Sequence, residues 1–427
     1  MTGILVFIGV ILLCLINVPI AVSLGIAAAA AIVATQGLAA LPNIPLTLYQ
    51  GATSFPLIAI PLFILAGAIM NSSGITQKLM DFCGALVGWM KGALAQVNVI
   101  TSMFFAEISG SAVADIAATG PIIIPAMKKR GYPGPFTAAV TSSTASLAII
   151  IPPSIPMILY GVMAGASIVQ LFVAGIVPGL LAGFTMMGLC HYYAVKYNWP
   201  VEEMFQWGKL WRAFKEAWAA LSLPIIILGG IFGGVVTATE GAALAVVAAL
   251  FVGGVIYRDL SWERLRSAII EGSVQTASVM LLVAASALLG LYLTEAQLPQ
   301  TIAKAMISIT TEKWAVLLIL NFFFLFIGMF LHSAAAIILV VPIVMPLVQQ
   351  VGIDPVHFGV IVTLNLAIGQ QTPPVASVLM LTCSIAKESV WDVSKANIPF
   401  IAVLVTTLVL ITYVPIVTLG LVNVFYR

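Results

Sequence analysis

A set of prolines and glycines recurs in this chain at a constant distance of 221 residues. The first set contains Pro121, Pro125, Gly131, Pro152 and Pro153, and the second contains Pro342, Pro346, Gly352, Pro373 and Pro374. Proline lacks a backbone donor and glycine tolerates unusual dihedral angles, so both residue types mark places where helices are interrupted. Because the two sets are in register, we expect two structural repeats whose helices break at corresponding points.

The composition places these repeats in a membrane. Of the 427 residues, 62% are hydrophobic and only 7% are charged, which leaves too few polar groups for a soluble surface. Apolar runs such as 219–236 and 239–257 approach the roughly 20 residues that one bilayer crossing needs. Repeats with matching helix breaks are typical of secondary transporters, whose binding sites lie at the repeat interface. The net charge of +2 gives no indication of a nucleic-acid partner.

Other classes of protein are disfavoured by what the sequence lacks. The four cysteines are scattered singly and the three histidines form no catalytic motif, so a disulfide framework, a structural metal or an enzyme is not expected. A channel is also disfavoured, because paired helix breaks suggest alternating access to a binding site.

The distribution of basic residues predicts that the second repeat is inverted relative to the first. Lys and Arg in short loops mark the cytoplasmic side. The loop at 127–134 carries three cations, whereas its counterpart at 348–355 carries none. The same rule puts both termini in the periplasm, provided that a break at 17–19 divides residues 3–35 into two spans.

Each half is expected to contain a span, an amphipathic arm on the membrane surface, a re-entrant helical hairpin and a broken helix, which is an inverted-repeat pattern typical of secondary transporters. We therefore divide the chain into scaffold spans (1–50), a span and arm (51–92), a transport domain with the first hairpin and broken helix (93–167), scaffold spans with basic cytoplasmic loops (168–273), a second span and arm (274–312), the second hairpin and broken helix of the transport domain (313–395), and a C-terminal span (396–427).

Polar residues at the hairpin tips and helix breaks are the candidate ion ligands. Irregular backbone at membrane depth must be buried in protein or line an aqueous cavity, so the tips and breaks are expected to face one another. Carbonyls freed by the Pro-Pro pairs, together with hydroxyls, suit a hard cation. We expect at least two sodium sites, with ligands drawn from Ser109, Gly110, Ser111, Thr141, Ser143, Ile151, Pro152, His332, Ser333, Asn365, Gly369 and Thr372. The alternative is that these residues only kink ordinary helices.

A substrate site is expected beside these ions. Its candidate residues are Ser111, Asp115, Ser154, Gln371 and Thr372. Asp115 either contacts substrate or ion or caps a helix. No Lys or Arg lies in a tip or break, so an anionic substrate would be held by half-helix N-termini, hydroxyls and sodium itself. Glu240 lies where a first-turn carboxylate complements a helix dipole, and a role in an ion or proton pathway is the alternative.

Four strings resemble the large membrane subunit of tripartite ATP-independent periplasmic (TRAP) transporters: SGSAVADIAATGP at 109–121, IPPS at 151–154, TATEGAA at 237–243 and GQQTPP at 369–374. The resemblance extends over essentially the whole chain. It implies a sodium-coupled importer of organic acids in a bacterial inner membrane that works by an elevator movement.

The resemblance also implies partners. They are a small membrane subunit and a periplasmic substrate-binding protein, and nothing in the first 50 residues resembles a fused small subunit. Substrates in the family include C4-dicarboxylates and sialic acids, and general similarity favours sialic acid. The alternative is a single-subunit sodium/carboxylate carrier that needs no binding protein.

One residue departs from the family pattern. Many members carry an acidic residue in the second hairpin tip, where this chain has His332. Loss of a fixed negative charge would weaken cation attraction or make it dependent on pH, so we hypothesise altered ion dependence. The alternative is that His332 only caps the hairpin turn.

Overall fold

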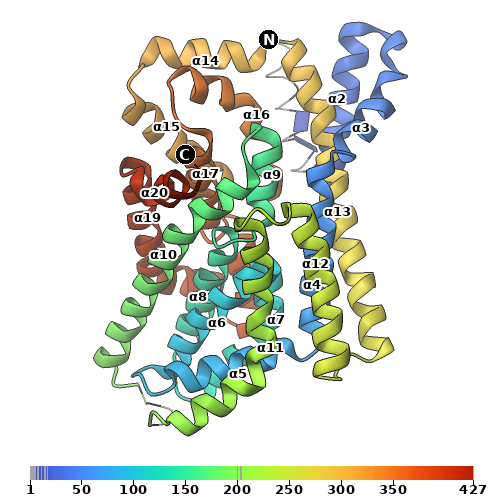
Figure 1. Cartoon of the computed structure of the whole chain (residues 1–427). Coiled ribbons are helices and arrows are strands. Elements are labelled where there is room, and N and C mark those ends of the chain that lie inside the picture. Colours follow the sequence, from blue (N-terminus) through green and yellow to red (C-terminus); the bar gives the residue numbers. More distant parts are fainter. Residues whose placement is uncertain are drawn as a thin grey trace.

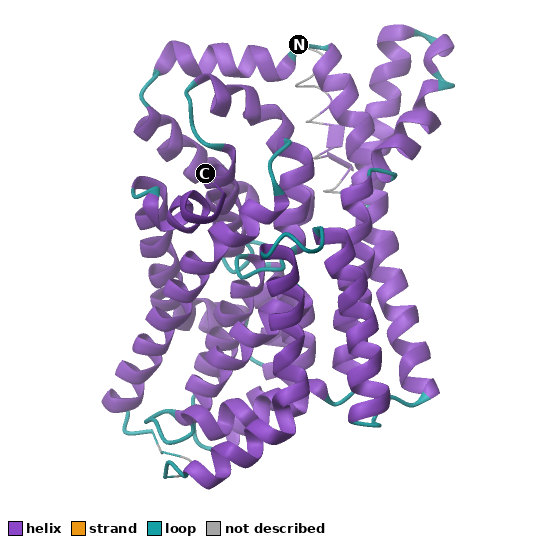
Figure 2. Ribbon diagram, viewed as in Figure 1, coloured by secondary structure: helices purple, strands orange, loops and turns teal. Residues whose placement is uncertain are grey.

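The computed structural model describes residues 6, 9–10, 12–13, 16, 18–199, 201 and 204–426. Within these residues every regular element is a helix (Figure 2). Seven of the described helices are long and apolar enough to cross a membrane. The predicted all-α membrane fold is therefore confirmed. The first residues and Asn17 lie outside the described set, so the break at 17–19 and the orientation of the N-terminus stay predictions.

The two repeats contain helices of the same order and register. The first comprises α4 (Ala59–Ser72), the arm α5 (Ile75–Val87), the hairpin helices α6 (Ala93–Ser109) and α7 (Ala112–Lys129), and the broken pair α8 (Gly134–Ala145) and α9 (Ile155–Ala164). The second comprises α13 (Trp262–Glu295), the arm α14 (Leu298–Ile309), α15 (Lys313–Gly328), α16 (Ser333–Gln350), α17 (Pro355–Gly369) and α18 (Ser377–Ala386). Helices α7 and α16 have 18 residues each and begin 221 residues apart.

Further helices surround the repeats. They are α2 (Ile20–Gln36), α3 (Asn43–Ala52), α10 (Ile168–Lys196), α11 (Trp207–Phe232), α12 (Ala238–Phe251), α19 (Val390–Tyr413) and α20 (Ile416–Tyr426). Helix α13 packs along α2, α3 and α4, and α4 also packs against α12. These helices lie together on the right of Figure 1, beside the hairpins and broken helices.

The repeats are inverted, as the charge distribution predicts. Figure 1 shows arm α5 at one end of the molecule and its counterpart α14 at the opposite end. The end with α5 also carries the basic loop after α7, and it is therefore the cytoplasmic end.

Some of the recurring prolines do not interrupt helices, so the prediction of breaks at those positions is wrong. Pro121 and Pro125 lie inside α7, and Pro342 and Pro346 lie inside α16. Neighbouring helices and local adjustments satisfy the backbone groups that a proline frees inside a membrane protein. The two Pro-Pro pairs do lie in the breaks, and the peptide bond between the two prolines of each pair is cis.

Glycine forms the first hairpin tip. Gly110 ends α6 with a φ of +57°, a conformation that costs glycine little. A Cβ at this position would lie 2.8 Å from the carbonyl oxygen of Pro153. Only glycine therefore allows this hairpin tip to approach the first helix break so closely.

Candidate functional site

A cavity of about 450 Å³ lies where both hairpin tips and both helix breaks meet α4 and α13. One wall contains tip residues 110–114 and 332–334, with Ile149, Ile155, Pro156 and Gln370 from the breaks. The other wall contains residues between 64 and 71 of α4 and between 271 and 282 of α13. Segments from the two halves of the chain thus share one cavity.

The α4 and α13 wall carries polar residues that the sequence reasoning missed. Asn71 comes from α4, and Glu271, Gln275 and Ser278 come from α13. The last three are spaced by four and then three residues, so they share one face of the helix. This spacing of polar residues within an apolar helix is the sequence signal that could have identified them as cavity residues. Glu271 is the only carboxylate side chain among the described residues that line this cavity, and His332 is the only other titratable one.

The first tip is attached to the first helix break. The backbone N–H of Ile155 donates to the carbonyl oxygen of Gly110 at 3.3 Å. Ser111 is the N-cap of α7 and lines the cavity. The side chain of Ser109 lies outside the described set.

Asp115 lies behind the tip and does not line the cavity. It occupies the first turn of α7 and is fully buried, and neither carboxyl oxygen has a hydrogen-bond partner. Thr119 donates to the Asp115 backbone carbonyl at 2.9 Å, and Ser102 donates to Thr144 at 3.3 Å. A buried carboxyl group without hydrogen bonds is costly, so it calls for a proton or a cation.

A buried polar cluster connects α6 and α8 in the first repeat. The Asn98 side chain donates to Thr141 Oγ1 at 2.7 Å, and Thr144 donates to Asn98 at 3.4 Å. The hydroxyls of Thr101 and Ser142 are buried without a partner. Both hydroxyls lie on the helices that this cluster connects, Thr101 on α6 and Ser142 on α8.

A second cluster joins the two repeats. Ser143 Oγ lies 2.7 Å from Gln371 Oε1 and 2.6 Å from Asn397 Oδ1. Gln371 Nε2 donates to Ser146 Oγ at 2.6 Å. Ser143, Ser146, Gln371 and Asn397 are all fully buried, so Gln371 belongs to the junction between the repeats and does not line the cavity.

The second repeat has its own polar cluster. Asn365 donates to Asn321 Oδ1 at 2.6 Å, while its own Oδ1 has no partner. The side-chain oxygen of Gln370, which lines the cavity, also has none. Gly369 packs on the end of the second hairpin, where an added Cβ would lie 2.5 Å from the backbone of Gly328.

Three other candidate hydroxyls and one candidate carbonyl pair lie in or near the breaks. Ser154 is buried and donates to the Ile149 carbonyl at 2.6 Å, and Thr372 is half-buried and donates to the Ile368 carbonyl at 2.9 Å. Ile151 and Pro152 are buried in the first break. In the second tip, Ser333 is buried, and its side chain faces the cavity with that of His332.

His332 is the N-cap residue of α16, and its side chain makes no capping hydrogen bond. It is exposed to the cavity. The imidazole is therefore placed to contact whatever occupies the cavity.

Glu240 does not line this cavity and caps α12. Its carboxylate accepts from the backbone N–H of Thr237 at 2.8 Å, and the hydroxyl of Thr237 accepts from the backbone N–H of Glu240 at 3.2 Å. This reciprocal pair is a capping box.

Comparisons with known proteins agree on one family. The family model described as "Tripartite ATP-independent periplasmic transporter, DctM component" matches residues 7–417. The isethionate TRAP transporter permease protein DctMQ of Oleidesulfovibrio alaskensis is 41% identical over 94% of this chain, which spans only 63% of that protein's length.

Two relatives from Vibrio cholerae match over most of their own length. The C4-dicarboxylate TRAP transporter large permease protein DctM is 35% identical, covering 96% of this chain and 95% of that protein. The sialic acid TRAP transporter large permease protein SiaM is 36% identical over 88% of each. Among solved structures, the Alcanivorax borkumensis YdaH transporter has the same fold, with a TM-score of 0.64 over 88% of each chain at 17% sequence identity.

Proposed function

We propose that this chain, which belongs to the DctM component family of tripartite ATP-independent periplasmic transporters, imports a small organic acid by coupling its movement to sodium. Its relatives are transporter permease subunits and not enzymes. The family and the seven apolar helices make it a multi-pass protein of the inner membrane. Family membership also implies a tripartite system with a small membrane subunit and a periplasmic binding protein.

The shared cavity is the observation that carries this proposal. Its two walls come from different bodies of helices, one with the hairpins and breaks and the other with α4 and α13. The facing surfaces contain small residues, including Gly67 and Ala68 on α4 and Ala114 and Ala117 on α7. Small side chains allow helices to approach closely without interlocking. The first body would therefore slide along the second as an elevator and carry substrate and ions with it.

Sodium would be bound in each repeat by oxygen atoms that have no other partner. In the first repeat these belong to Asp115, Thr101 and Ser142, near Thr141 and the tip at 109–111. In the second they belong to Asn365 and Gln370, near Gly369 and the tip at His332–Ser333. Hard cations prefer oxygen ligands, so the donor set fits sodium. Each sodium ion would be transported together with the substrate. Its positive charge would balance the negative charge of the substrate, because no Lys or Arg is among the described residues that line the cavity.

The substrate would bind in the cavity with its anionic group at the hairpin tips. The N-terminal ends of α7 and α16 both face the cavity through Ser111 and Ser333, and helix N-termini favour negative charge. A cavity of about 450 Å³ has the size that ordinary ligand sites have, so it can admit a sugar acid. We propose sialic acid as the first substrate to test and a C4-dicarboxylate as the second.

The test is uptake of radiolabelled sialic acid into proteoliposomes that contain this chain and its small membrane subunit. The assay compares an inward sodium gradient with a potassium control, each with and without the cognate periplasmic binding protein. We expect uptake only when sodium and the binding protein are both present. Uptake that persists without the binding protein would instead support a single-subunit carrier. Uptake that persists without sodium would contradict the proposal that transport is coupled to sodium.

A further inference from the structure

A second cavity, of about 570 Å³, lies at the cytoplasmic end of the molecule. It is enclosed by arm α5, hairpin helices α6 and α7, and α11 with the segment just before it. None of its lining residues belongs to the cavity at the hairpin tips. The proposed transport site therefore leaves it without a role.

The inner wall of this cytoplasmic cavity is apolar. Its side chains come from three helices and include Met80, Leu94, Val97, Ile122 and Ile123. Ile122 of α7 keeps 42% of its surface exposed. A water-filled cavity would leave Ile122 in contact with solvent, so an apolar chain is the occupant that this wall favours.

Two aromatic rings also line this cavity. The rings of Trp89 and Phe205 both line the cavity, and their centroids are 6.1 Å apart in an edge-to-face arrangement. Tryptophan is enriched at the level of the lipid headgroups, where one side of the ring is apolar and the other is wet. These rings place the mouth of the cavity at the membrane interface.

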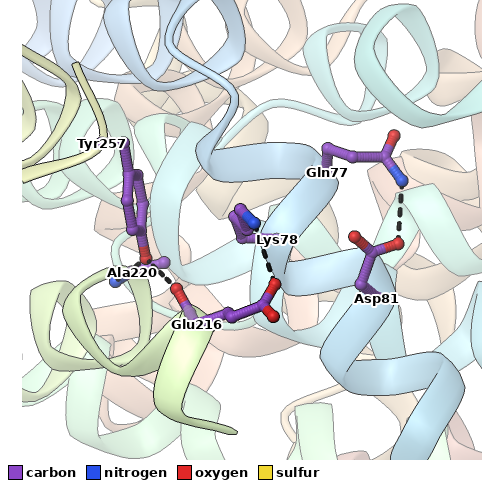
Figure 3. Close-up of polar contacts among 6 residues, drawn as sticks. All are labelled: Gln77, Lys78, Asp81, Glu216, Ala220 and Tyr257. Carbon is purple, nitrogen blue, oxygen red and sulfur yellow. Dashed lines mark hydrogen bonds and ion pairs between the residues drawn. The ribbon is translucent and has the colours of Figure 1, made fainter. Parts of the chain in front are cut away.

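The described residues of the rim carry charges of both signs. The cations among them are Lys78, Lys209 and Arg212, and the carboxylates are Asp81 and Glu216. Figure 3 shows Lys78 paired with Glu216 at 2.9 Å and Gln77 donating to Asp81 at 2.9 Å. The hydrogen bond from Lys78 to Glu216 raises the pKa of Lys78, so Lys78 stays positively charged at neutral pH.

Arg212 is the cation that no carboxylate neutralises within the described part of the chain. Its Nε donates to the Gly208 carbonyl of the same helix at 3.2 Å. Lys209 lies three residues earlier, so both side chains project from one face of α11 toward the cavity. The guanidinium can accept a phosphate in two parallel hydrogen bonds.

We propose that this cavity binds an anionic phospholipid of the cytoplasmic leaflet. An acyl chain lies against α6 and α7, the glycerol region lies beside Trp89 and Phe205, and the phosphate group contacts Arg212. The lining combines apolar side chains, two aromatic rings and cations, which are the surfaces that the acyl chain, the glycerol region and the phosphate of a phospholipid each favour. Because α7 belongs to a hairpin and α11 does not, the lipid connects the two and stabilises their present arrangement.

The experiment uses the full chain in detergent, with lipid occupancy measured by native mass spectrometry and stability by thermal unfolding. Phosphatidylglycerol, phosphatidylcholine and glycerol 3-phosphate are titrated separately. We expect phosphatidylglycerol to bind and raise the unfolding temperature and the other two to have little effect. Arg212→Gln should weaken phosphatidylglycerol binding about fivefold, the usual effect of one cation at an anionic surface. Arg266→Gln is the matched control, because Arg266 is exposed on α13 and lies outside this cavity.

A second variant tests the apolar wall independently of charge. Ile122→Trp should fill the acyl space and reduce phosphatidylglycerol occupancy while every cation remains. Equal binding of phosphatidylcholine and phosphatidylglycerol would overturn the proposal, as would phosphatidylglycerol binding that neither variant changes. Binding of glycerol 3-phosphate as tight as that of the lipid would also overturn it, because the site would then recognise a soluble anion.

Discussion

At the scale of single residues, the side chain of Gln371 has the most consequential position among the candidates. It contacts Ser143, Ser146 and Asn397, and so it joins elements from the two repeats. Gln371→Leu keeps the volume but leaves buried hydroxyl and amide groups unpaired, each at a cost of about 1–3 kcal/mol. We expect a clear fall in the unfolding temperature and reduced uptake, measured by fluorescence thermal shift and proteoliposome transport.

Gln300→Leu is the control for that substitution, because Gln300 is exposed on α14. It should leave the unfolding temperature almost unchanged. If the two variants unfolded at the same temperature, the buried network would not stabilise the junction between the repeats.

Glu240 provides a test that separates a helix cap from an ion pathway. Glutamine can replace glutamate in a capping box, because its side-chain oxygen still accepts from the N-cap backbone. We therefore expect Glu240→Gln to retain the initial rate of uptake and its sodium dependence. A large loss of rate in Glu240→Gln, with normal folding, would show that the negative charge itself takes part in transport.

At the scale of elements, the second hairpin depends on close backbone contact with α17. The backbones of Gly328 and Gly369 meet so closely that a methyl group does not fit between them. Gly369→Ala should separate hairpin and helix, which lowers both the unfolding temperature and the rate of uptake. Gly290→Ala is the matched control, because a Cβ there meets no atom within 4 Å and alanine favours the helix. Equal uptake by the two variants would contradict the proposed role of this contact.

The same elements show how far the sequence alone could lead. The recurring helix breaks predicted the paired hairpins, and the difference in loop charge predicted the inversion. Both signals can be read from short stretches of sequence. The internal prolines of α7 and α16 were misread, since only the surrounding helices determine whether a proline ends a helix. Glu271 and Gln275 were missed as cavity residues because the face that α13 turns toward the tips depends on tertiary packing. Hydrogen-bond partners such as Gln371 and Asn397 likewise cannot be read from spacing.

At the scale of the whole molecule, inversion of the repeats supports the proposed elevator, in which one cavity would serve both sides of the membrane. The two hairpins approach the cavity with related structures of opposite orientation, so in this proposal each would gate one side. The α4 and α13 wall belongs to neither hairpin. If the hairpins move past this wall as we propose, a probe on it would report which side of the membrane has access to the cavity.

Ser278 of α13 is the position at which this movement can be measured. It is exposed to the cavity, whereas Ser286 of the same helix is 4% exposed. In a Cys14→Ser background, the remaining cysteines Cys83, Cys190 and Cys383 are buried. An elevator exposes Ser278→Cys to each side in turn, so a membrane-impermeant thiol reagent should modify it from either side. Sodium should slow modification from one side and accelerate it from the other, while Ser286→Cys stays unreactive. Modification from a single side, at a rate that sodium does not change, would indicate a fixed cavity and would exclude the elevator movement.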